Sequence, residues 1–188
     1  MVSINKSFSI SVVLPTWNRV ERIKKCLPTF LATKVQNVQF IIIDNNSDDG
    51  TWDYLQSVAL KDKRVEIYRN SQNVGGIKSY LRAYCTVNSP YALLLGDDDL
   101  MVGDYIERCL EIFQKHDDVS IIHHLFDGWQ RTQKMHKEPY TIYSKGPHAI
   151  DKIFMFSGSF PGLAIRMKNF HLKNFPLGEE VIYPQVKI

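Results

Sequence analysis

Short apolar runs alternate with amphipathic stretches along the first two thirds of the chain. The apolar runs are rich in Val, Ile and Leu, as is typical of buried strands, and the stretches between them repeat apolar residues at helical spacing. This pattern predicts strands at 8–14, 38–43, 65–68 and 91–95, and helices at 19–32, 51–60, 77–87 and 104–116. Four strand–helix units in succession indicate an α/β fold with a mostly parallel central sheet and helices on both faces.

Individual residues indicate where these elements begin and end. Pro15 is expected to end the first strand, because proline cannot donate to a central ladder. Thr51 is expected to cap the second helix, and Gly75-Gly76 to form a backbone turn into the third. Pro28 is expected to kink or shorten the first helix. The basic residues of that helix are expected on the face away from its apolar stripe, and they are Arg19, Arg22, Lys24 and Lys25.

The rest of the chain has a less regular pattern. It predicts a strand at 119–123, a loop or hairpin at 127–139, a helix at 145–156, a strand at 162–165 and a short helix at 168–175. The chain ends shortly after Gly178-Glu179-Glu180-Val181. We therefore expect it to be a piece of a longer protein, truncated at its C-terminus.

Composition places the chain among ordinary globular proteins. With 44% hydrophobic and 23% charged residues it is neither a disordered tail nor a coiled coil, and a net charge of +3 is too small to indicate a nucleic-acid or membrane partner. Cys26, Cys85 and Cys109 form no CxxC pair, so we expect buried reduced thiols and no zinc site or disulfide. The sequence has neither a signal-peptide h-region nor an apolar run of the roughly 18 residues that a membrane span needs. These features predict a cytoplasmic protein.

Acidic residues gather after the second and fourth predicted strands. The first group is Asp44, Asp48, Asp49 and Asp53; the second is Asp97, Asp98, Asp99, Asp104 and Glu107. In an open parallel sheet, ligands bind outside the carboxyl ends of the strands. Both groups are therefore predicted at the ligand-binding edge.

The triplet Asp97-Asp98-Asp99 is the sharpest of these features. Two unit charges 4 Å apart repel by about 4 kcal/mol at an effective dielectric of 20, so adjacent carboxylates in a cleft favour a bound cation. Mg²⁺ and Mn²⁺ suit carboxylate oxygens together with substrate phosphates. The alternatives are a solvated acidic turn, or Asp99 as the cap of the next helix. The sequence contains no GxGxxG, GxxxxGK[ST] or GxSxG pattern, which removes the main support for Rossmann dinucleotide, P-loop and hydrolase sites.

Four segments, in this order, resemble the family-two glycosyltransferases of GT-A fold. They are VVLPTWNR (Val12–Arg19), IIIDNNSDDGT (Ile41–Thr51), NVGG (Asn73–Gly76) and YALLLGDDDL (Tyr91–Leu100). A fainter similarity lies between residues 157 and 182, in GSFPGLAIRMKNF and LGEE. The resemblance implies a GT-A type, Rossmann-like sheet. It also implies that residues 1–115 form a nucleotide-sugar-binding half and residues 116–188 an acceptor-side half of one domain.

The resemblance also implies roles for individual residues. The residues implied at the nucleotide are Pro15, Thr16 and Trp17 beside base and ribose, Asp44 and Asn45 at the edge of the base, and Asp97 and Asp98 at the ribose or metal-bound water. Asp99 and Asp97 are the implied ligands of Mn²⁺ or Mg²⁺, and Glu180 or Glu179 is the implied general base. Four aromatic side chains either shape the acceptor side or anchor the core and loops; they are Trp129, Tyr140, Phe156 and Phe160.

The expected function is metal-dependent transfer of a sugar from a nucleoside-diphosphate sugar to an acceptor hydroxyl with inversion, in surface polysaccharide or glycoconjugate biosynthesis. The expected partners are that donor and a saccharide or lipid-linked saccharide acceptor, with no nucleic acid. Any peripheral association with the inner face of the membrane is expected through a missing C-terminal part. A sugar nucleotidyltransferase, a non-enzymatic receiver-type signalling domain and an inactive fragment are the alternatives. The first alternative would need a glycine- and basic-rich loop after strand one, and the second a lone acceptor Asp with a late Lys.

Overall fold

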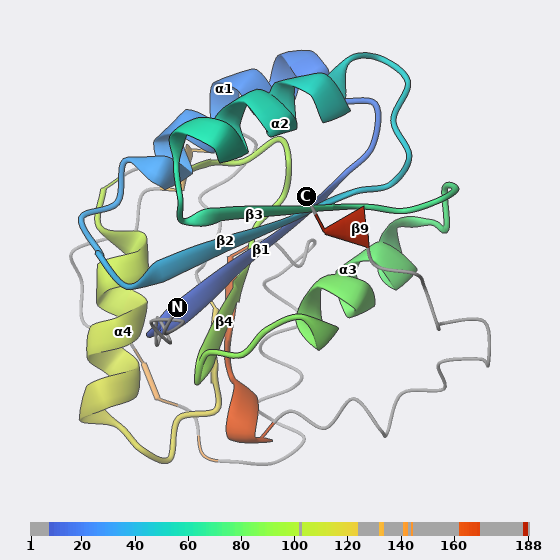
Figure 1. Cartoon of the computed structure of the whole chain (residues 1–188). Helices are drawn as coiled ribbons and strands as arrows, with labels where there is room; N and C mark the ends of the chain where they lie inside the picture. Colours follow the sequence, from blue (N-terminus) through green and yellow to red (C-terminus); the bar gives the residue numbers. More distant parts are fainter. Residues whose placement is uncertain are drawn as a thin grey trace, which may run out of the picture.

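A seven-stranded sheet forms the centre of the structure, a computed structural model (Figure 1). The model describes residues 8–101, 103–123, 132–133, 141–142, 144, 162–169 and 186–187. The strands are β1 (Ile10–Thr16), β2 (Val38–Asp44), β3 (Val65–Arg69), β4 (Tyr91–Leu94), β6 (Ile121–Ile122), β8 (Leu163–Arg166) and β9 (Val186–Lys187), in the order β6-β8-β4-β1-β2-β3-β9. The pairs β1–β2, β1–β4 and β2–β3 are parallel, whereas β8 is antiparallel to β4 and β6, and β9 to β3. The short strands β5 (Leu100–Met101) and β7 (Thr132–Gln133) pair separately.

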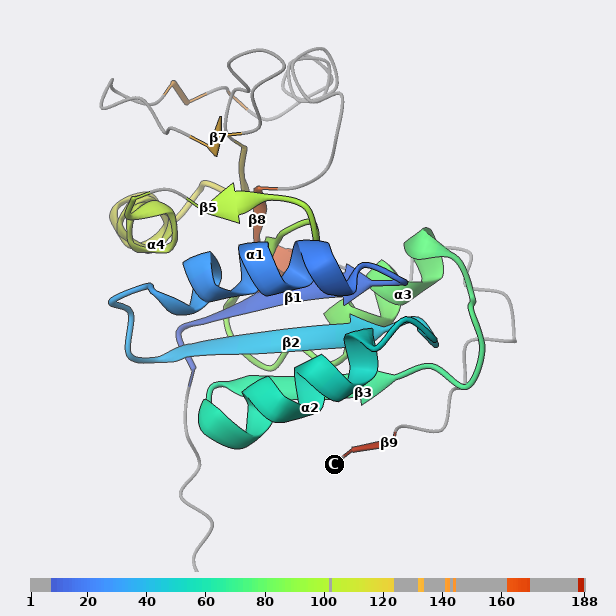
Figure 2. The ribbon, with the colours of Figure 1, turned by 90° about the horizontal axis from the view of Figure 1, so that it is seen from above.

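Helices cover both faces of this sheet. They are α1 (Val20–Leu31), α2 (Thr51–Lys61), α3 (Gly76–Cys85) and α4 (Tyr105–Lys115), followed by the 3₁₀ helix η1 (Met167–Asn169). Residues such as Val12 and Leu14 of β1 pack into one buried cluster with α1, α2 and α4, and Val13 packs into the other with α3. Figures 1 and 2 show α1 and α2 side by side along the strands and α3 on the opposite face. The prediction of a mostly parallel α/β sheet with two covered faces is therefore confirmed. All four of these helices are too short or too polar to cross a lipid bilayer, as is the rest of the described chain.

Several predicted boundaries are wrong for identifiable reasons. Strand β1 runs through Pro15, which pairs with Ile43 of β2, because β4 pairs with β1 only as far as Val13 and leaves that side of Pro15 without a ladder. Thr51 is the first residue of α2 and not its cap; Gly50 precedes the helix with φ 90°. Pro28 does not shorten α1, which continues to Leu31.

Other predictions have mixed outcomes. Gly75, with φ 82°, makes the predicted turn into α3. Cys26 and Cys109 are buried and unpaired as expected, but Cys85 is exposed. The loop or hairpin at 127–139 (apart from β7), the helix at 145–156 and the helix at 168–175 beyond Asn169 lie outside the described residues.

Arg166 holds β8 against α4. Its Nη2 donates to the carbonyls of Phe113 at 2.6 Å and His116 at 2.8 Å, and its Nε donates to Val119 at 2.8 Å. These carbonyls belong to the last turn of α4 and the segment after it, where a cation also complements the helix dipole. Strand β8, which pairs with β4, is thereby also anchored to α4.

Asp49 ties the beginnings of α1 and α2 together at the carboxyl edge of the sheet. Its Oδ2 accepts the backbone N–H of Val20 at 2.9 Å, and its Oδ1 accepts both the N–H and the hydroxyl of Thr51, at 3.0 and 2.6 Å. Burial raises the pKa of Asp49, but the hydrogen bonds from Thr51 and Val20 outweigh it and hold this pKa below its ordinary value. The two loops that frame the edge are therefore braced by one ionised carboxylate.

We expect Asp49→Ala to lower the free energy of unfolding at pH 7 by about 1 kcal/mol, the usual loss for a helix cap. A carboxylate with a lowered folded pKa stabilises the protein above its unfolded pKa and loses this effect as the pH falls through the folded value. The difference from wild type should therefore shrink below pH about 4, which urea denaturation across pH would measure. Asp48→Ala, at an exposed neighbouring position, is the matched control. A difference that does not vary with pH would show that Asp49 does not act as a carboxylate.

Candidate functional site

Three predicted site residues meet at the carboxyl edge although they are far apart in sequence. Thr16 ends β1 and stands in register with Asp44 at the end of β2, and Asp97 follows β4 on the other side of β1. The Thr16 hydroxyl donates to Asp97 Oδ2 at 2.8 Å. From β1 the chain continues to β2 and β3 on one side of β1 and then crosses to β4 on the other side. Open α/β sheets bind ligands at such a switch in strand order, which here lies between β1 and β4.

The acidic turn, residues Asp97, Asp98 and Asp99, is closed by its own hydrogen bonds. The backbone N–H of Gly96 donates to Asp99 Oδ2 at 2.7 Å, and Asp99 is only 3% exposed. A Cβ added to Gly96 would lie 2.8 Å from the same oxygen and 3.2 Å from Asp98 Oδ1, so a larger residue here would displace the Asp99 carboxylate. Burial raises the pKa of Asp97, and the Thr16 hydrogen bond and the Arg19 charge offset this only in part.

Two arginines face the acidic turn: Arg19, which directly precedes α1, and Arg22 in its first turn. Arg22 Nη1 lies 3.2 Å from Asp98 Oδ2, and Arg19 Nη1 lies 3.7 Å from that oxygen and 3.9 Å from Asp97 Oδ1. Both side chains lie off the apolar stripe of the helix, as the sequence predicts, and are 40% and 56% exposed; their pairing with the acidic turn was not predicted. The overlooked signal is the spacing of Arg19, Arg22 and Cys26, which puts them on one side of a helix. The Cys26 thiol donates to the Asp97 carbonyl at 3.3 Å, and burial followed by the charge of Asp97 raises its pKa to about 12.

Asp44, the last residue of β2, is fully buried, with 0% exposure. Its oxygens accept the Ser47 N–H at 3.2 and 3.3 Å, and Arg69 Nε lies 3.1 Å from Oδ2. Arg69 also donates to the Ser47 carbonyl at 2.6 Å and lies 5.4 Å from the centre of the Trp52 ring. Burial raises the pKa of Asp44, while Ser47 and Arg69 oppose it. Arg69 was not predicted; a basic residue at the end of β3, in register with Asp44, could have indicated it.

Asn45 holds two loops together. Its Oδ1 accepts Asn70 Nδ2 at 2.7 Å and the Val74 N–H at 3.0 Å, and its Nδ2 donates to Asn73 Oδ1 at 2.7 Å. Both acceptor positions of the amide oxygen and one of its two N–H groups are thus used within the protein. Asn45 fastens the end of β2 to the turn that begins α3.

Two aromatic side chains complete the described part of the edge. Trp17, beside Thr16, is 49% exposed, whereas Tyr80 of α3 is half-buried. Burial, together with the charges of Asp97, Asp99 and Asp98, raises the pKa of Tyr80 to about 12. Its ring packs against the apolar cluster on the α3 face of the sheet.

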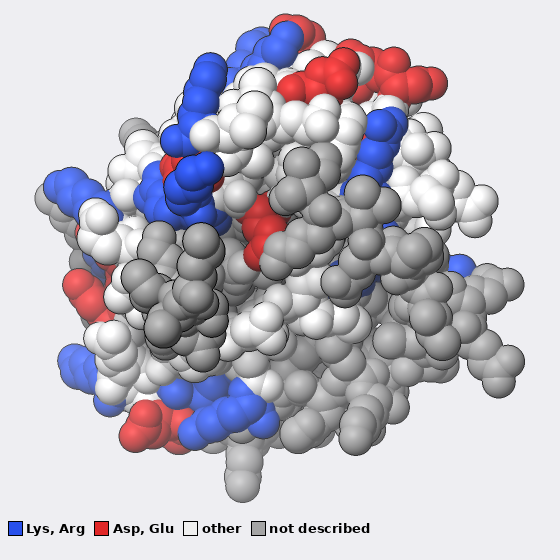
Figure 3. Space-filling model, viewed as in Figure 1, with Lys and Arg blue, Asp and Glu red and all other residues white. Residues whose placement is uncertain are grey.

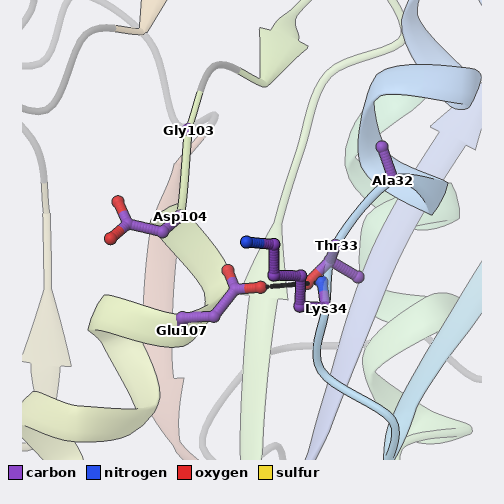
Figure 4. A pocket seen from close by; sticks show the side chains of 6 residues that line it. All are labelled: Ala32, Thr33, Lys34, Gly103, Asp104 and Glu107. Carbon is purple, nitrogen blue, oxygen red and sulfur yellow. Dashed lines mark hydrogen bonds between the residues drawn. The ribbon is translucent and has the colours of Figure 1, made fainter.

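Not every acidic residue predicted at this edge lies there. Asp104 and Glu107 line a pocket of about 320 Å³ together with Ala32, Thr33, Lys34 and Gly103 (Figure 4). The Glu107 carboxylate accepts the Thr33 hydroxyl at 2.8 Å and the Lys34 N–H at 2.9 Å. Because α1 begins at the carboxyl edge and runs back along the sheet, this pocket at its far end lies toward the opposite edge, at the amino ends of the strands. The prediction for Asp104 and Glu107 is wrong because the chain after the acidic turn runs back along α1 before α4 begins.

The donor set of the acidic turn fits a hard divalent cation. Mg²⁺-like ions are held by one or two carboxylates together with substrate phosphates, and the turn offers carboxylates alone. Within the described ranges, no three His, Cys, Asp or Glu side chains converge so as to hold an ion without such help. On the face in Figure 3, basic and acidic side chains are interspersed among the described residues, which agrees with the small net charge. The remaining predicted residues lie outside the described residues; they are Trp129, Tyr140, Phe156, Phe160, Glu179 and Glu180.

Known proteins share both this sequence pattern and this fold. The family model for glycosyl transferase family 2 matches residues 11–170. The putative colanic acid biosynthesis glycosyl transferase WcaA of Escherichia coli (strain K12) is 25% identical over 146 residues, which are 74% of this chain and 50% of WcaA. The chain spans about a third to a half of the length of the curated relatives it matches.

Solved structures show the same fold at low sequence identity. TarS 1-349 of S. aureus, in complex with UDP-GlcNAc, aligns with a TM-score of 0.66 at 18% identity over 85% of this chain and 45% of TarS. The mannosyltransferase PcManGT of Pyrobaculum calidifontis, in complex with GDP-Man and Mn²⁺, aligns with a TM-score of 0.59 at 14% identity over 63% of this chain and 36% of PcManGT. The GT-A type fold is thereby established independently of the sequence match.

A match of this extent sets aside the nucleotidyltransferase and receiver-domain alternatives. It covers β1 to β8 and therefore every described residue of the carboxyl edge. The chain belongs to glycosyl transferase family 2.

Proposed function

We propose that this protein transfers a sugar from a nucleoside-diphosphate sugar to an acceptor hydroxyl with inversion, in the biosynthesis of a surface polysaccharide or another glycoconjugate. The observation that carries the proposal is the convergence of Thr16, Asp44 and the acidic turn on one edge of the sheet, with the Thr16–Asp97 hydrogen bond joining β1 to the turn. The names of the relative WcaA and of the nucleotide-sugar complexes of TarS and PcManGT support this class of donor and product.

The donor would lie over the carboxyl ends of β1 and β2. Trp17 is half exposed and offers a flat ring to the base, since stacking on an aromatic side chain accepts any base. Pro15 and Thr16 would line the base and ribose from the end of β1. Asp44 and Asn45 would shape the edge of the base site largely by holding its loops, because their described hydrogen bonds are to the protein itself.

Asp99 and Asp97 would hold Mn²⁺ or Mg²⁺ together with the donor diphosphate, and Asp98 would bind metal-bound water or the ribose. A bound divalent cation stabilises the negative charge that forms on the departing diphosphate. The protein contributes the rigid placement of these carboxylates. Gly96 closes the turn around Asp99, and the Thr16 hydroxyl orients Asp97.

The acceptor would be a saccharide or lipid-linked saccharide, bound by the part of the chain from residue 116 onward, and residues 1–115 would bind the donor. An acceptor hydroxyl attacks poorly until a base removes its proton, and Glu180 or Glu179 is the proposed base. One base acting with one cation suits a single displacement, which inverts the anomeric carbon. The proposed location is the cytoplasm, at the inner face of the membrane if further sequence binds there.

We expect the double change Asp97→Asn, Asp99→Asn to abolish the Mn²⁺-dependent part of nucleotide binding. A thermal-shift panel of nucleoside diphosphates, with and without Mn²⁺, measures this, because a ligand that binds only the folded state raises the melting temperature by mass action. The wild-type protein should show at least one nucleotide whose shift grows with Mn²⁺. Without ligand, the double variant should melt at or above the wild-type temperature, since repulsion between the carboxylates is relieved.

The matched control for this change is Asp117→Asn, Asp118→Asn, which removes the same charge from two exposed residues after α4. It should leave the Mn²⁺-dependent shift intact. Unchanged Mn²⁺ dependence in the Asp97, Asp99 variant would rule out these carboxylates as the cation site.

Glu180→Gln should reduce sugar transfer by about 10²–10⁴-fold, the usual contribution of a general base, because it keeps the size of the side chain but removes the proton acceptor. Binding of the nucleoside diphosphate should change little. A transfer assay on Glu180→Gln and Glu179→Gln in parallel makes each variant the control for the other. A loss confined to Glu179→Gln would move the role by one residue, and near-wild-type transfer by both would remove this motif from the mechanism.

A further inference from the structure

In this structure the acidic turn is already paired with positive charge from the protein. Arg22 Nη1 lies 3.2 Å from Asp98 Oδ2, and Arg19 Nη1 lies 3.7 and 3.9 Å from carboxylate oxygens of Asp98 and Asp97. Arg19 Nη1 is a buried nitrogen without a hydrogen bond, because both oxygens are too distant to accept one. It therefore acts as a charge lying between two carboxylates.

The arginines are brought to the turn by the helix itself. Arg19, Arg22 and Cys26 lie on one side of α1, and the Cys26 thiol fixes that side against the turn through the Asp97 carbonyl at 3.3 Å. The Arg19 N–H donates to the Thr51 hydroxyl at 3.2 Å, which anchors the backbone at the start of the helix. As whole side chains Arg19 and Arg22 are 40% and 56% exposed, although the Nη1 atom of Arg19 is buried between the carboxylates. Neither side chain belongs to the buried core of the sheet, so their pairing with the turn can be exchanged for another anion.

The two arginines reduce the net negative charge of the acidic turn. Three carboxylates carry three negative charges and two guanidiniums return two positive ones, so the turn keeps one net negative charge. A divalent cation arriving alone meets two competing positive charges. When a cation binds together with a diphosphate, the diphosphate supplies negative charge, and the arginines can pair with it instead of with the acidic turn.

We propose that Arg19 and Arg22 couple cation binding to donor binding, by occupying the acidic turn in the free protein and passing to the diphosphate when the donor and cation arrive together. The inference rests on the proposed nucleotide-sugar function and assigns a positioning role to two residues of this chain. Coupling of this kind is reciprocal, so the cation must also tighten binding of the nucleoside diphosphate.

The test measures Mn²⁺ affinity from the electron paramagnetic resonance signal of free Mn²⁺, for the whole chain alone and with saturating UDP or GDP, with protein-free titrations to account for the Mn²⁺ that the nucleotide binds in solution. The variants are Arg22→Gln and Arg19→Gln, Arg22→Gln. Lys24→Gln is the matched control, because it removes the same charge from α1 but its Nζ pairs with Glu21 at 3.0 Å. Circular dichroism melting verifies that each variant is folded.

Each arginine removed should tighten the binding of Mn²⁺ alone about 3- to 10-fold, as expected for a positive charge several ångströms from the ion in a solvated, salt-screened site. Affinity with nucleotide should change less, so the factor by which nucleotide tightens Mn²⁺ binding should fall. Lys24→Gln should alter the affinity for Mn²⁺ alone by less than about 2-fold.

Equal Mn²⁺ affinity in the wild-type protein and the double variant would overturn the inference. So would an equal effect of Lys24→Gln, which would indicate a general surface-charge effect. Nucleotide binding without any Mn²⁺ binding would overturn the inference while leaving the donor class of the proposed function in place. If the folded wild-type chain binds neither nucleotide nor Mn²⁺, the proposed function is overturned as well.

Discussion

Four carboxylates, those of Asp44, Asp97, Asp98 and Asp99, follow two strands at one edge of the sheet, and the cost of holding ionised carboxylates in buried or partly buried positions is the constraint that the residues around them meet. Each is balanced in a different way. Asp44 is buried against Arg69, Asp97 accepts the Thr16 hydroxyl, Asp98 pairs with Arg22, and Asp99 accepts the Gly96 N–H. Ionised carboxylates in such positions would otherwise favour protonation or loop opening.

The parallel strands make this arrangement possible. Strands β1 and β2 end together at Thr16 and Asp44, whereas β4 ends earlier, opposite Val13, and is followed by the acidic turn. The apolar side chains of these strands form the buried core beneath the edge. Asp49 and Asn45 then fasten the loops above it, one between α1 and α2 and the other between β2 and the turn before α3. Arg69 is held by Trp52 and Ser47, whereas Arg19 and Arg22 have exposed side chains. The firmly held residues at the end of β2 thus lie beside more exposed arginines at the acidic turn, an arrangement that suits the donor and cation binding proposed above.

Much of this could be predicted because it depends on local chemistry. The strand–helix alternation determined the α/β class, and glycine at Gly75, whose φ is positive, determined the turn into α3. The motif order from Val12 to Leu100 determined the family and identified the acidic residues that follow β2 and β4. None of this required knowledge of which residues touch across the sheet.

Tertiary structure alone decided which charges meet. The sequence pattern assigned Arg19 and Arg22 to a solvated helix face, but α1 packs so that this face looks onto the acidic turn. It grouped Asp104 and Glu107 with the triplet, yet the chain carries them to the far end of α1. It also left Arg69 unnoticed, because the Asp44–Arg69 pair arises from the β2–β3 register. Periodicity describes one element at a time, whereas ion pairs between elements depend on register, packing angle and the path of the connecting loops.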